Sequence, residues 1–194
     1  MIKKILLIGA ALLFTTQLMA EEMHEGVDNK GMHHKESKYY AVVKGLYIVG
    51  DDVEHGEALL SGDAGYGIGV DLGYRLEYGF SLEYDFSYST NTVTETVEGE
   101  EPESADATYM THAIDLVYGD EIVEKLELFI KVGYEYEIEK IDDYGIDKTS
   151  DGAVIGTGVE YEFDDSYKII GEYEHSTIDG PRGDSIYLGV MYNF

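Results

Sequence analysis

Hydrophobic and polar positions alternate one by one along most of this chain. In residues 65–78, apolar or aromatic side chains occupy every second position from Tyr66 to Leu76, and glycine or charged side chains occupy the positions between them. Residues 80–89 and 126–139 repeat this pattern. Because successive side chains of a β-strand point to opposite faces, a period of two predicts strands with one apolar and one polar face.

Weaker versions of the same alternation extend the prediction to eight strands. They are residues 38–49, 65–78, 80–89, 108–118, 126–139, 153–163, 167–176 and 185–194. The connections alternate between long polar loops (51–63, 90–107, 140–151, 177–184) and short turns (77–79, 119–125, 164–166). This pattern predicts an all-β fold over residues 38–194, an eight-stranded antiparallel up-and-down transmembrane β-barrel with both ends of the barrel chain on the short-turn side.

The polar face decides between a membrane barrel and a soluble one. The charged side chains lie on the same face as the glycines, so an outward apolar face would place the charges inside the cylinder. The alternative is a secreted, lipocalin-like barrel with its apolar face inward. Two features favour the membrane form: strands of about 9–11 residues cross a bilayer when tilted, and tyrosines gather near strand ends on the apolar face, as in an interfacial belt. The facing of residues 38–49 stays open, because Lys44 shares its face with Leu46 and Ile48.

The N-terminus is typical of an exported protein. Lys3 and Lys4 precede an apolar run over residues 5–14, and residues 15–20 end in Ala20, which predicts a cleaved signal peptide over residues 1–20. We expect residues 21–37 to form a flexible periplasmic tail. The chain contains no cysteine, which excludes a lipoprotein anchor and disulfides. These features predict a location in the outer membrane of a Gram-negative bacterium.

Charge and composition narrow the possible partners. The formal net charge of −27 argues against nucleic-acid binding, which needs basic patches. The 18 tyrosines distinguish the chain from a disordered acidic polymer, which is poor in aromatic residues. We expect a monomer without a cofactor. Its expected partners are outer-membrane lipids and lipopolysaccharide, and periplasmic chaperones and the barrel-assembly machinery during biogenesis.

The C-terminal strand carries a family resemblance. Its sequence SIYLGVMYNF alternates down to Tyr192 and the terminal Phe194, and so resembles the assembly signal of outer-membrane barrels. The segment GTGVEYEFDDSYKIIGEYEH, residues 156–175, resembles the strand–turn–strand of the small eight-stranded OmpA/OmpX-type family, which includes opacity-protein-like and other porin-family barrel domains. This resemblance implies a fold and a compartment, while family members have structural, adhesive and catalytic roles.

The inward charges are the first candidate site. Acids outnumber bases on the predicted inner face: Asp71, Glu83, Asp85, Asp115, Glu127, Glu135, Glu137, Glu160, Glu162, Glu172 and Glu174 against Lys44, Arg75, Lys131 and Lys168. We expect a lumen charge network centred on Lys44, Asp71, Arg75, Glu83, Asp85, Asp115, Glu127, Lys131, Glu160 and Glu172. It fits either a salt-bridged plug, since an eight-stranded interior is only wide enough for side chains, or a narrow cation-favouring path.

Two further sets of residues suggest chemistry. The segment that contains His175 and Ser176 resembles the C-terminal end of outer-membrane lipid A deacylases, but adjacent residues of a strand point to opposite faces, whereas a nucleophile needs its base within reach. The N-terminal residues His24, His33 and His34 are candidate metal ligands without zinc-site spacing. For both sets we expect the plainer outcome: no enzyme and no metal site.

The longest predicted loop is acidic. Its carboxylates are Glu95, Glu98, Glu100, Glu101, Glu103 and Asp106. Such a loop offers a contact surface, with divalent cations bridging it to lipopolysaccharide. We therefore expect a structural or surface-interaction barrel with a plugged interior. The alternatives are a narrow cation-favouring pore and a lipid A-modifying hydrolase.

Overall fold

The computed structural model describes residues 37–56 and 58–194. The predicted signal peptide, nearly all of the predicted tail, and the candidate ligands His24, His33 and His34 lie outside the described residues. Within the described part of the chain, no helix is long and apolar enough to cross a membrane.

The described residues form strands almost throughout. In chain order they are β1 (Tyr39–Ile48), β2 (Asp52–His55), β3 (Ala58–Gly62), β4 (Gly65–Arg75), β5 (Phe80–Val97), β6 (Glu103–Val123), β7 (Leu126–Ile141), the short 3-10 helix η1 (Asp142–Tyr144), β8 (Ile146–Asp164), β9 (Tyr167–Ser176) and β10 (Ser185–Asn193). Eight of these strands, all except β2 and β3, form the barrel wall.

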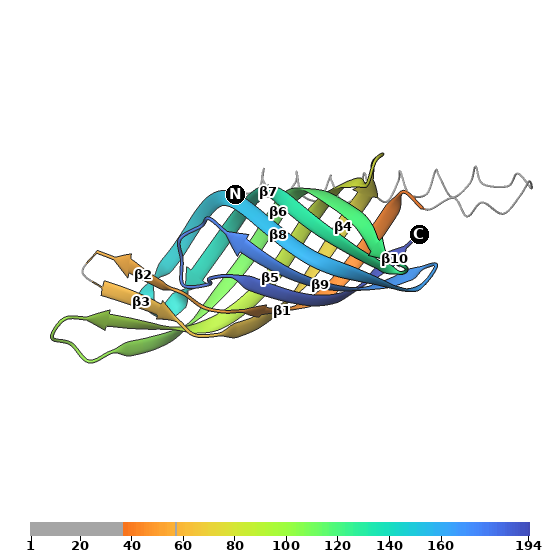
Figure 1. Ribbon diagram of the computed structural model, residues 1–194. Helices are drawn as coiled ribbons and strands as arrows, with labels where there is room; N and C mark the ends of the chain where they lie inside the picture. The colour runs from red at the N-terminus through yellow and green to blue at the C-terminus, as the bar shows by residue number, and fades with distance from the viewer. Residues whose placement is uncertain (1–36, 57) are drawn as a thin grey trace, which may run out of the picture. The chain divides into compact units, whose positions relative to one another are not determined.

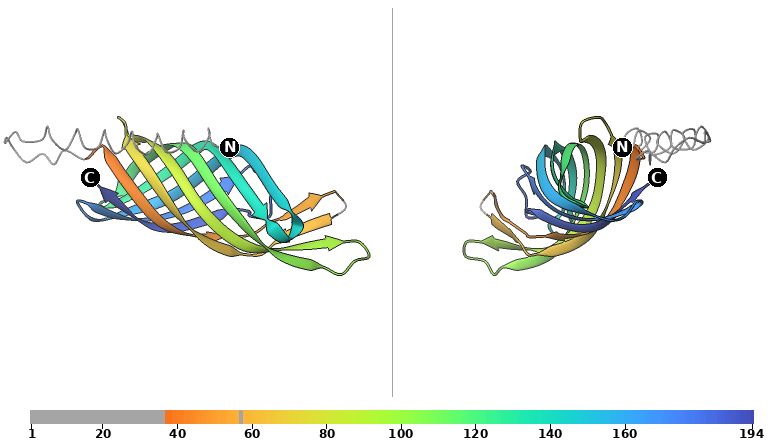
Figure 2. Two further views of the ribbon diagram at one scale, coloured as in Figure 1. Left: turned by 180° about the vertical axis from the view of Figure 1, so that it is seen from behind. Right: turned by 45° about the vertical axis from the view of Figure 1, so that its right-hand side comes forward.

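The wall closes on itself (Figures 1 and 2). Each barrel strand pairs antiparallel with its neighbour along the chain, and β1 pairs with both β4 and β10, so that no strand of the wall is left at an edge. The partners Tyr40 and Asn193 mark the short-turn end of the β1–β10 seam, and Ile48 and Ser185 mark its other end. This closed antiparallel barrel confirms the predicted fold class.

The strands continue beyond the predicted limits at the end opposite the short turns. β5 has 18 residues and β6 has 21, so residues 90–107 form a paired hairpin instead of the predicted loop. Residues 51–63 likewise contain β2 and β3, and β3 pairs with the extension of β5. The prediction of loops there was wrong because polar residues were taken as loop residues, whereas the threonines and valines of this segment favour strands.

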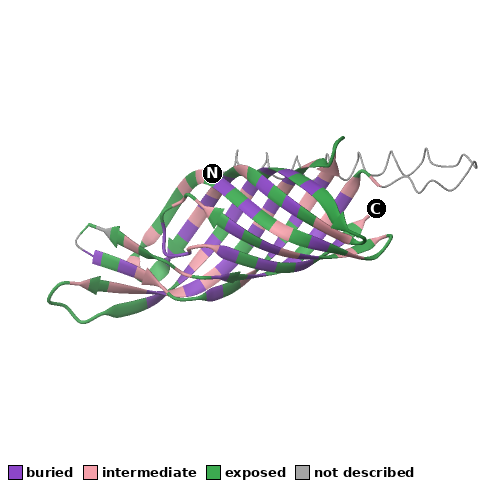
Figure 3. Cartoon of the chain, viewed as in Figure 1, coloured by how far each residue is buried: buried purple, intermediate pink, exposed green. Residues whose placement is uncertain are grey.

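Buried and exposed residues alternate along the strands of the wall, as the bands in Figure 3 show. Outward side chains such as Tyr66 and Ile68 are 72% and 67% exposed, whereas the inward carboxylates Asp71 and Asp85 are 1% and 4% exposed. The lipocalin-like facing is therefore wrong for this chain. β1 resolves its own ambiguity, because Lys44 is buried together with Leu46, Ile48 and the other alternate residues of the strand.

Candidate functional site

Two buried lysines occupy the middle of the barrel interior. Lys44 on β1 places its Nζ 2.9 Å from Asp71 Oδ1, 2.6 Å from Asp85 Oδ2 and 3.5 Å from Glu172 Oε2. Lys131 on β7 is 3.4 Å from the same Asp85 oxygen, 2.8 Å from Glu174 Oε2, and also pairs with Glu172. We call these six residues the central belt: Lys44, Asp71, Asp85, Lys131, Glu172 and Glu174. Shared carboxylates join both lysines into one network.

Strand register explains why acids crowd together in the central belt and beside it. Asp71 of β4 lies directly opposite Asp85 of β5, and Glu83 of β5 lies opposite Asp115 of β6. The Tyr40 hydroxyl donates a hydrogen bond to Glu83 Oε1 at 2.5 Å. Neither carboxylate oxygen of Asp115, which is fully buried, has a hydrogen-bond partner among the described residues. The middle of the barrel therefore holds more carboxylates than its two lysines pair with.

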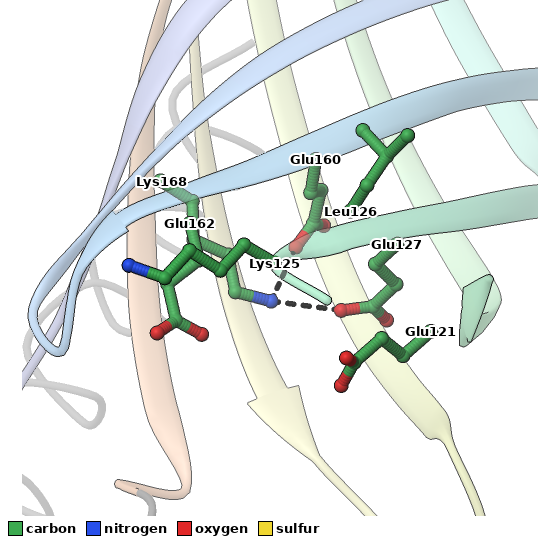
Figure 4. A pocket seen from close by; sticks show the side chains of 7 residues that line it. All are labelled: Glu121, Lys125, Leu126, Glu127, Glu160, Glu162 and Lys168. Carbon is green, nitrogen blue, oxygen red and sulfur yellow. Dashed lines mark hydrogen bonds and ion pairs between the residues drawn. The ribbon is translucent and has the colours of Figure 1, made fainter. Parts of the chain in front are cut away.

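A second ion-pair group lies at the short-turn end. Lys168 Nζ is 2.8 Å from Glu127 Oε2 and 2.7 Å from Glu160 Oε2. Figure 4 shows this lysine between the two carboxylates in a small open pocket lined by Glu121, Lys125, Leu126, Glu127, Glu160, Glu162 and Lys168. Arg75 lies at the same end but has other partners: it donates hydrogen bonds to Asn193 Oδ1 and to the Ser37 carbonyl oxygen, and its guanidinium group stacks over Tyr40.

Apolar side chains flank the central belt on both sides. One cluster consists of Tyr40, Val42, Val117, Phe129, Ile170 and Met191. The other consists of Leu46, Ile48, Leu60, Val93, Ala105, Ala107, Tyr109, Ile141 and Tyr187. The inward residues of β1 give their order: Tyr40 and Val42 toward the short turns, Lys44 in the belt, then Leu46 and Ile48. A charged layer thus lies between two apolar layers.

Arg182 closes the opposite end of the interior. Its Nη2 is 2.6 Å and its Nη1 3.3 Å from the two carboxylate oxygens of Glu135, and its Nε is 2.8 Å from Glu137 Oε2. All three side chains are almost fully buried. Sequence reasoning predicted the two glutamates to face inward but missed Arg182, because it lies in the connection between β9 and β10, where no alternation places a side chain.

The backbone of this connection, residues 177–184, is held in place at several points; we call it the plug loop. The Pro181 carbonyl oxygen accepts a hydrogen bond of 3.0 Å from Asn91 Nδ2, and the Arg182 carbonyl oxygen accepts one of 3.1 Å from the Gly50 amide. Gly62 allows a close approach, since a Cβ atom there would lie only 1.9 Å from the Pro181 oxygen. Pro181 and Arg182 are both buried, so the loop fills the mouth of the barrel.

The candidate catalytic pair points two ways. Ser176 Oγ donates to Glu135 Oε1 inside the barrel at 2.9 Å, whereas His175 Nδ1 lies outside, 2.7 Å from Asp184 Oδ1. Among the hydrogen bonds of the described residues, none joins Ser176 to His175. Asp184 also accepts a hydrogen bond from Tyr173. Partial burial raises the pKa of Asp184, but the hydrogen bonds from Tyr173 and His175 outweigh it and hold the pKa below its usual range. The arrangement fastens the plug loop to β9.

The remaining candidates lie on the outer surface. Tyr192 and Phe194 pack together at the short-turn end with ring centroids 5.2 Å apart, and Tyr167 lies against Tyr192. The loop acids lie on or beside the β5–β6 hairpin, which extends past the barrel wall (Figure 1). In residues 37–56 and 58–194, no group of three or more histidine, aspartate or glutamate side chains is arranged to hold a metal ion.

Known structures share this architecture. The chain is similar to the outer membrane protein OprG of Pseudomonas aeruginosa, with 12% sequence identity and a TM-score of 0.67 over 82% of this chain and 97% of that one. It is similar to neisserial surface protein A, with 17% identity and a TM-score of 0.57 over 83% and 100%. It is also similar to Ail, the attachment invasion locus protein of Yersinia pestis, with 16% identity and a TM-score of 0.51 over 80% and 98%. At these identities the likeness shows the fold.

The family is established by a sequence model. No curated protein sequence matches this chain. The model described as the outer membrane protein beta-barrel domain matches residues 8–194, which include every strand of the wall. The match covers nearly the whole chain and agrees with the closed wall, its apolar outer face and its charged inner face. The chain therefore belongs to the outer membrane protein beta-barrel domain family.

Proposed function

We propose that this protein is a closed barrel that acts through its extracellular surface, and that its interior stabilises the fold without conducting ions. The observation that carries this proposal is the order of layers along the interior. The central belt lies between two apolar clusters, and Arg182 of the plug loop adds a buried ion pair with Glu135 at the mouth. Apolar layers raise the cost of moving an ion through so narrow a barrel, because the ion would lose its hydration.

The extracellular surface supports the second half of the proposal. Long connections mark the extracellular end of such barrels, and here the β5–β6 hairpin extends beyond the wall. Its exposed carboxylates include Glu98, Glu100, Glu101 and Glu103. This charge suits basic partners, or lipopolysaccharide bridged by divalent cations. We propose that the protein works as a monomer among outer-membrane lipids, with this hairpin as its main contact surface.

Planar-bilayer recording tests the closed state. The purified protein should give no steady conductance steps at a salt concentration and voltage at which an open porin conducts.

Deleting residues 98–102 should leave the barrel folded, as seen from heat-modifiable mobility on a denaturing gel, while binding to lipopolysaccharide vesicles with Ca²⁺ falls. Unchanged vesicle binding after this deletion would remove the hairpin from the proposed surface.

A narrow cation-favouring pore is the second candidate. The acid excess favours it, because Asp115 is buried without a hydrogen-bond partner among the described residues and lies opposite another carboxylate, that of Glu83. Steady, cation-selective current through the wild-type barrel would support this candidate over the closed one. The separation of His175 from Ser176 gives a lipid A hydrolase no comparable support.

Export and assembly complete the proposal. We propose cleavage after Ala20, delivery by periplasmic chaperones, and recognition of the terminal aromatic residues by the barrel-assembly machinery. Tyr192 and Phe194 are exposed on the outer face beside the β1–β10 seam, where a binding partner has access to them before the barrel closes. The N-terminal mass of the purified protein tests the cleavage site. The amount of folded barrel in a Phe194→Asp variant tests the assembly signal.

A further inference from the structure

Glu135 and Glu137 form an acidic recess at the barrel mouth, and its shape matches the guanidinium group of Arg182. Glu135 presents both carboxylate oxygens to the two terminal nitrogens of Arg182, and Glu137 Oε2 lies 2.8 Å from the third nitrogen, Nε, as an ion pair. Three contacts along one planar group match a guanidinium fork. A lysine ammonium is a single point and cannot reproduce this fork.

The recess is held ready by the wall and does not depend on the loop that fills it. Glu135 and Glu137 are alternate inward residues of β7, paired on both sides with β6 and β8. The Ser176 hydroxyl on β9 donates to Glu135 Oε1 at 2.9 Å and orients it. Both carboxylates are at least 98% buried, so removal of their cation would leave two negative charges without a partner.

The surroundings favour a cation even when Arg182 is bound. Glu139 follows on the same face of β7 and is buried. Among the described residues, Arg182 is the only basic side chain whose ion pairs with Glu135 or Glu137 are seen. One guanidinium charge therefore faces the two carboxylates of Glu135 and Glu137, and an anion would be repelled from the recess.

We propose that Glu135 and Glu137 form a guanidinium-binding site at the extracellular mouth, which Arg182 fills as a tethered ligand. A guanidinium cation supplied from solution then occupies the same site when Arg182 is absent. The ligand class is either a small guanidinium compound or an arginine side chain of another polypeptide. This inference goes beyond the proposed closed state, because it holds whether or not the barrel conducts.

Chemical rescue tests the site. The full mature protein is purified in detergent as wild type, Arg182→Ala, and Arg182→Ala combined with Glu135→Gln and Glu137→Gln. We expect Arg182→Ala to unfold at a lower temperature than wild type, and millimolar methylguanidinium to recover most of that loss with a saturable dependence. Methylammonium at the same concentration should recover much less. The wild type should not shift, because its own arginine occupies the site.

The triple variant is the matched control, and it should show no rescue because its carboxylates are gone. Equal stabilisation of all three proteins, no saturable effect on Arg182→Ala, or equal rescue by methylammonium would overturn the proposal. If Arg182→Ala does not fold, its refolding yield with methylguanidinium against methylammonium gives the same readout by gel mobility. An acetylated Gly-Arg-Gly amide separates the ligand sources: rescue by this peptide as well points to arginine side chains, and rescue by methylguanidinium alone points to small cations.

Discussion

Two ion-pair groups in the interior of this barrel are built differently. The central belt draws its lysines from the middle of β1 and β7, where pairing on both sides holds each backbone. The mouth draws Arg182 from the plug loop, whose position depends on scattered contacts with Asn91, Gly50 and Gly62. Both groups bury charge, but only the belt is enclosed by apolar layers on both sides.

This difference predicts that the central belt is rigid and that the plug loop can open. Lys44 and Lys131 belong to paired strands and cannot move out of the belt unless that pairing breaks. Loss of either charge therefore leaves the belt carboxylates buried and away from water. The plug loop belongs to no strand of the wall, so we expect it to move without breaking strand pairing, with water replacing its contacts. We therefore expect the belt to determine global stability and the plug loop to determine local access to the lumen.

Lys44→Met should have the largest effect. It removes the partner of Asp71, Asp85 and Glu172 inside the barrel, which we expect to cost about 3–5 kcal/mol of unfolding free energy. Lys140→Met is the matched control, because Lys140 and Asp147 form an exposed pair at 3.9 Å and should contribute about 0–1 kcal/mol. Urea unfolding in detergent or lipid measures both, and equal costs would mean that the belt is hydrated.

Leu72→Arg tests the alternation that places the belt. Leu72 faces outward between Tyr66 and Tyr74, which mark the two ends of the apolar band on β4. An arginine in the lipid should cost about 2–4 kcal/mol. Leu76→Arg, in the turn beyond β4, should cost about 0–1 kcal/mol because it lies at the interface. Comparable unfolding free energies for the two variants would place Leu72 away from the bilayer core.

Gly62→Ala should displace the plug loop and leave the belt intact. The new Cβ would clash with the Pro181 carbonyl oxygen, at an expected cost of about 1–3 kcal/mol. Limited proteolysis should then cut residues 177–184 faster than in the wild type. Gly45→Ala is the control, since its Cβ would meet nothing closer than 4.0 Å and should change stability by about 0.5 kcal/mol or less. Unchanged cleavage in Gly62→Ala would show that the loop is not held there.

Asp184→Asn should have the smallest effect, and the effect should depend on pH. Because the pKa of Asp184 is held below its usual range, its stabilisation is present above that range and is lost as pH falls through the lowered pKa. We expect the wild type to exceed the variant by less than about 1 kcal/mol at pH 6, since the side chain is partly exposed. The melting-temperature difference between the two should shrink as pH falls below the usual pKa range of an aspartate. A difference that grows in acid would contradict this role.

The alternation along the chain predicts the wall well because the wall obeys one rule throughout. Tyr187 follows the same rule. It lies between Ile186 and Leu188, which belong to the apolar outer face of the strand. Its own ring is buried, with 4.1 Å between Lys44 Nζ and the ring centroid. The period of two alone is enough to place this tyrosine on the inner face.

The plug loop shows where such prediction ends. Its sequence TIDGPRGD is mostly polar and has no period, so nothing local distinguishes a solvated tip from an inserted one. The position of Arg182 follows from acids on β7, an asparagine on β5 and glycines in another loop, which are far apart along the chain. The one indirect signal is the surplus of inward carboxylates, which implies that some cation comes from outside the strands.

Access to the lumen tests the central claim most directly. Because the chain contains no cysteine, a single introduced thiol reports on its own position. Ser89→Cys lies inside the wall and is 1% exposed, whereas Ser104→Cys lies exposed on the β5–β6 hairpin. A small cationic methanethiosulfonate added to the folded protein should modify Ser104→Cys rapidly and leave Ser89→Cys unmodified. Modification of Ser89→Cys at a similar rate would show an open, water-filled interior and contradict the closed barrel.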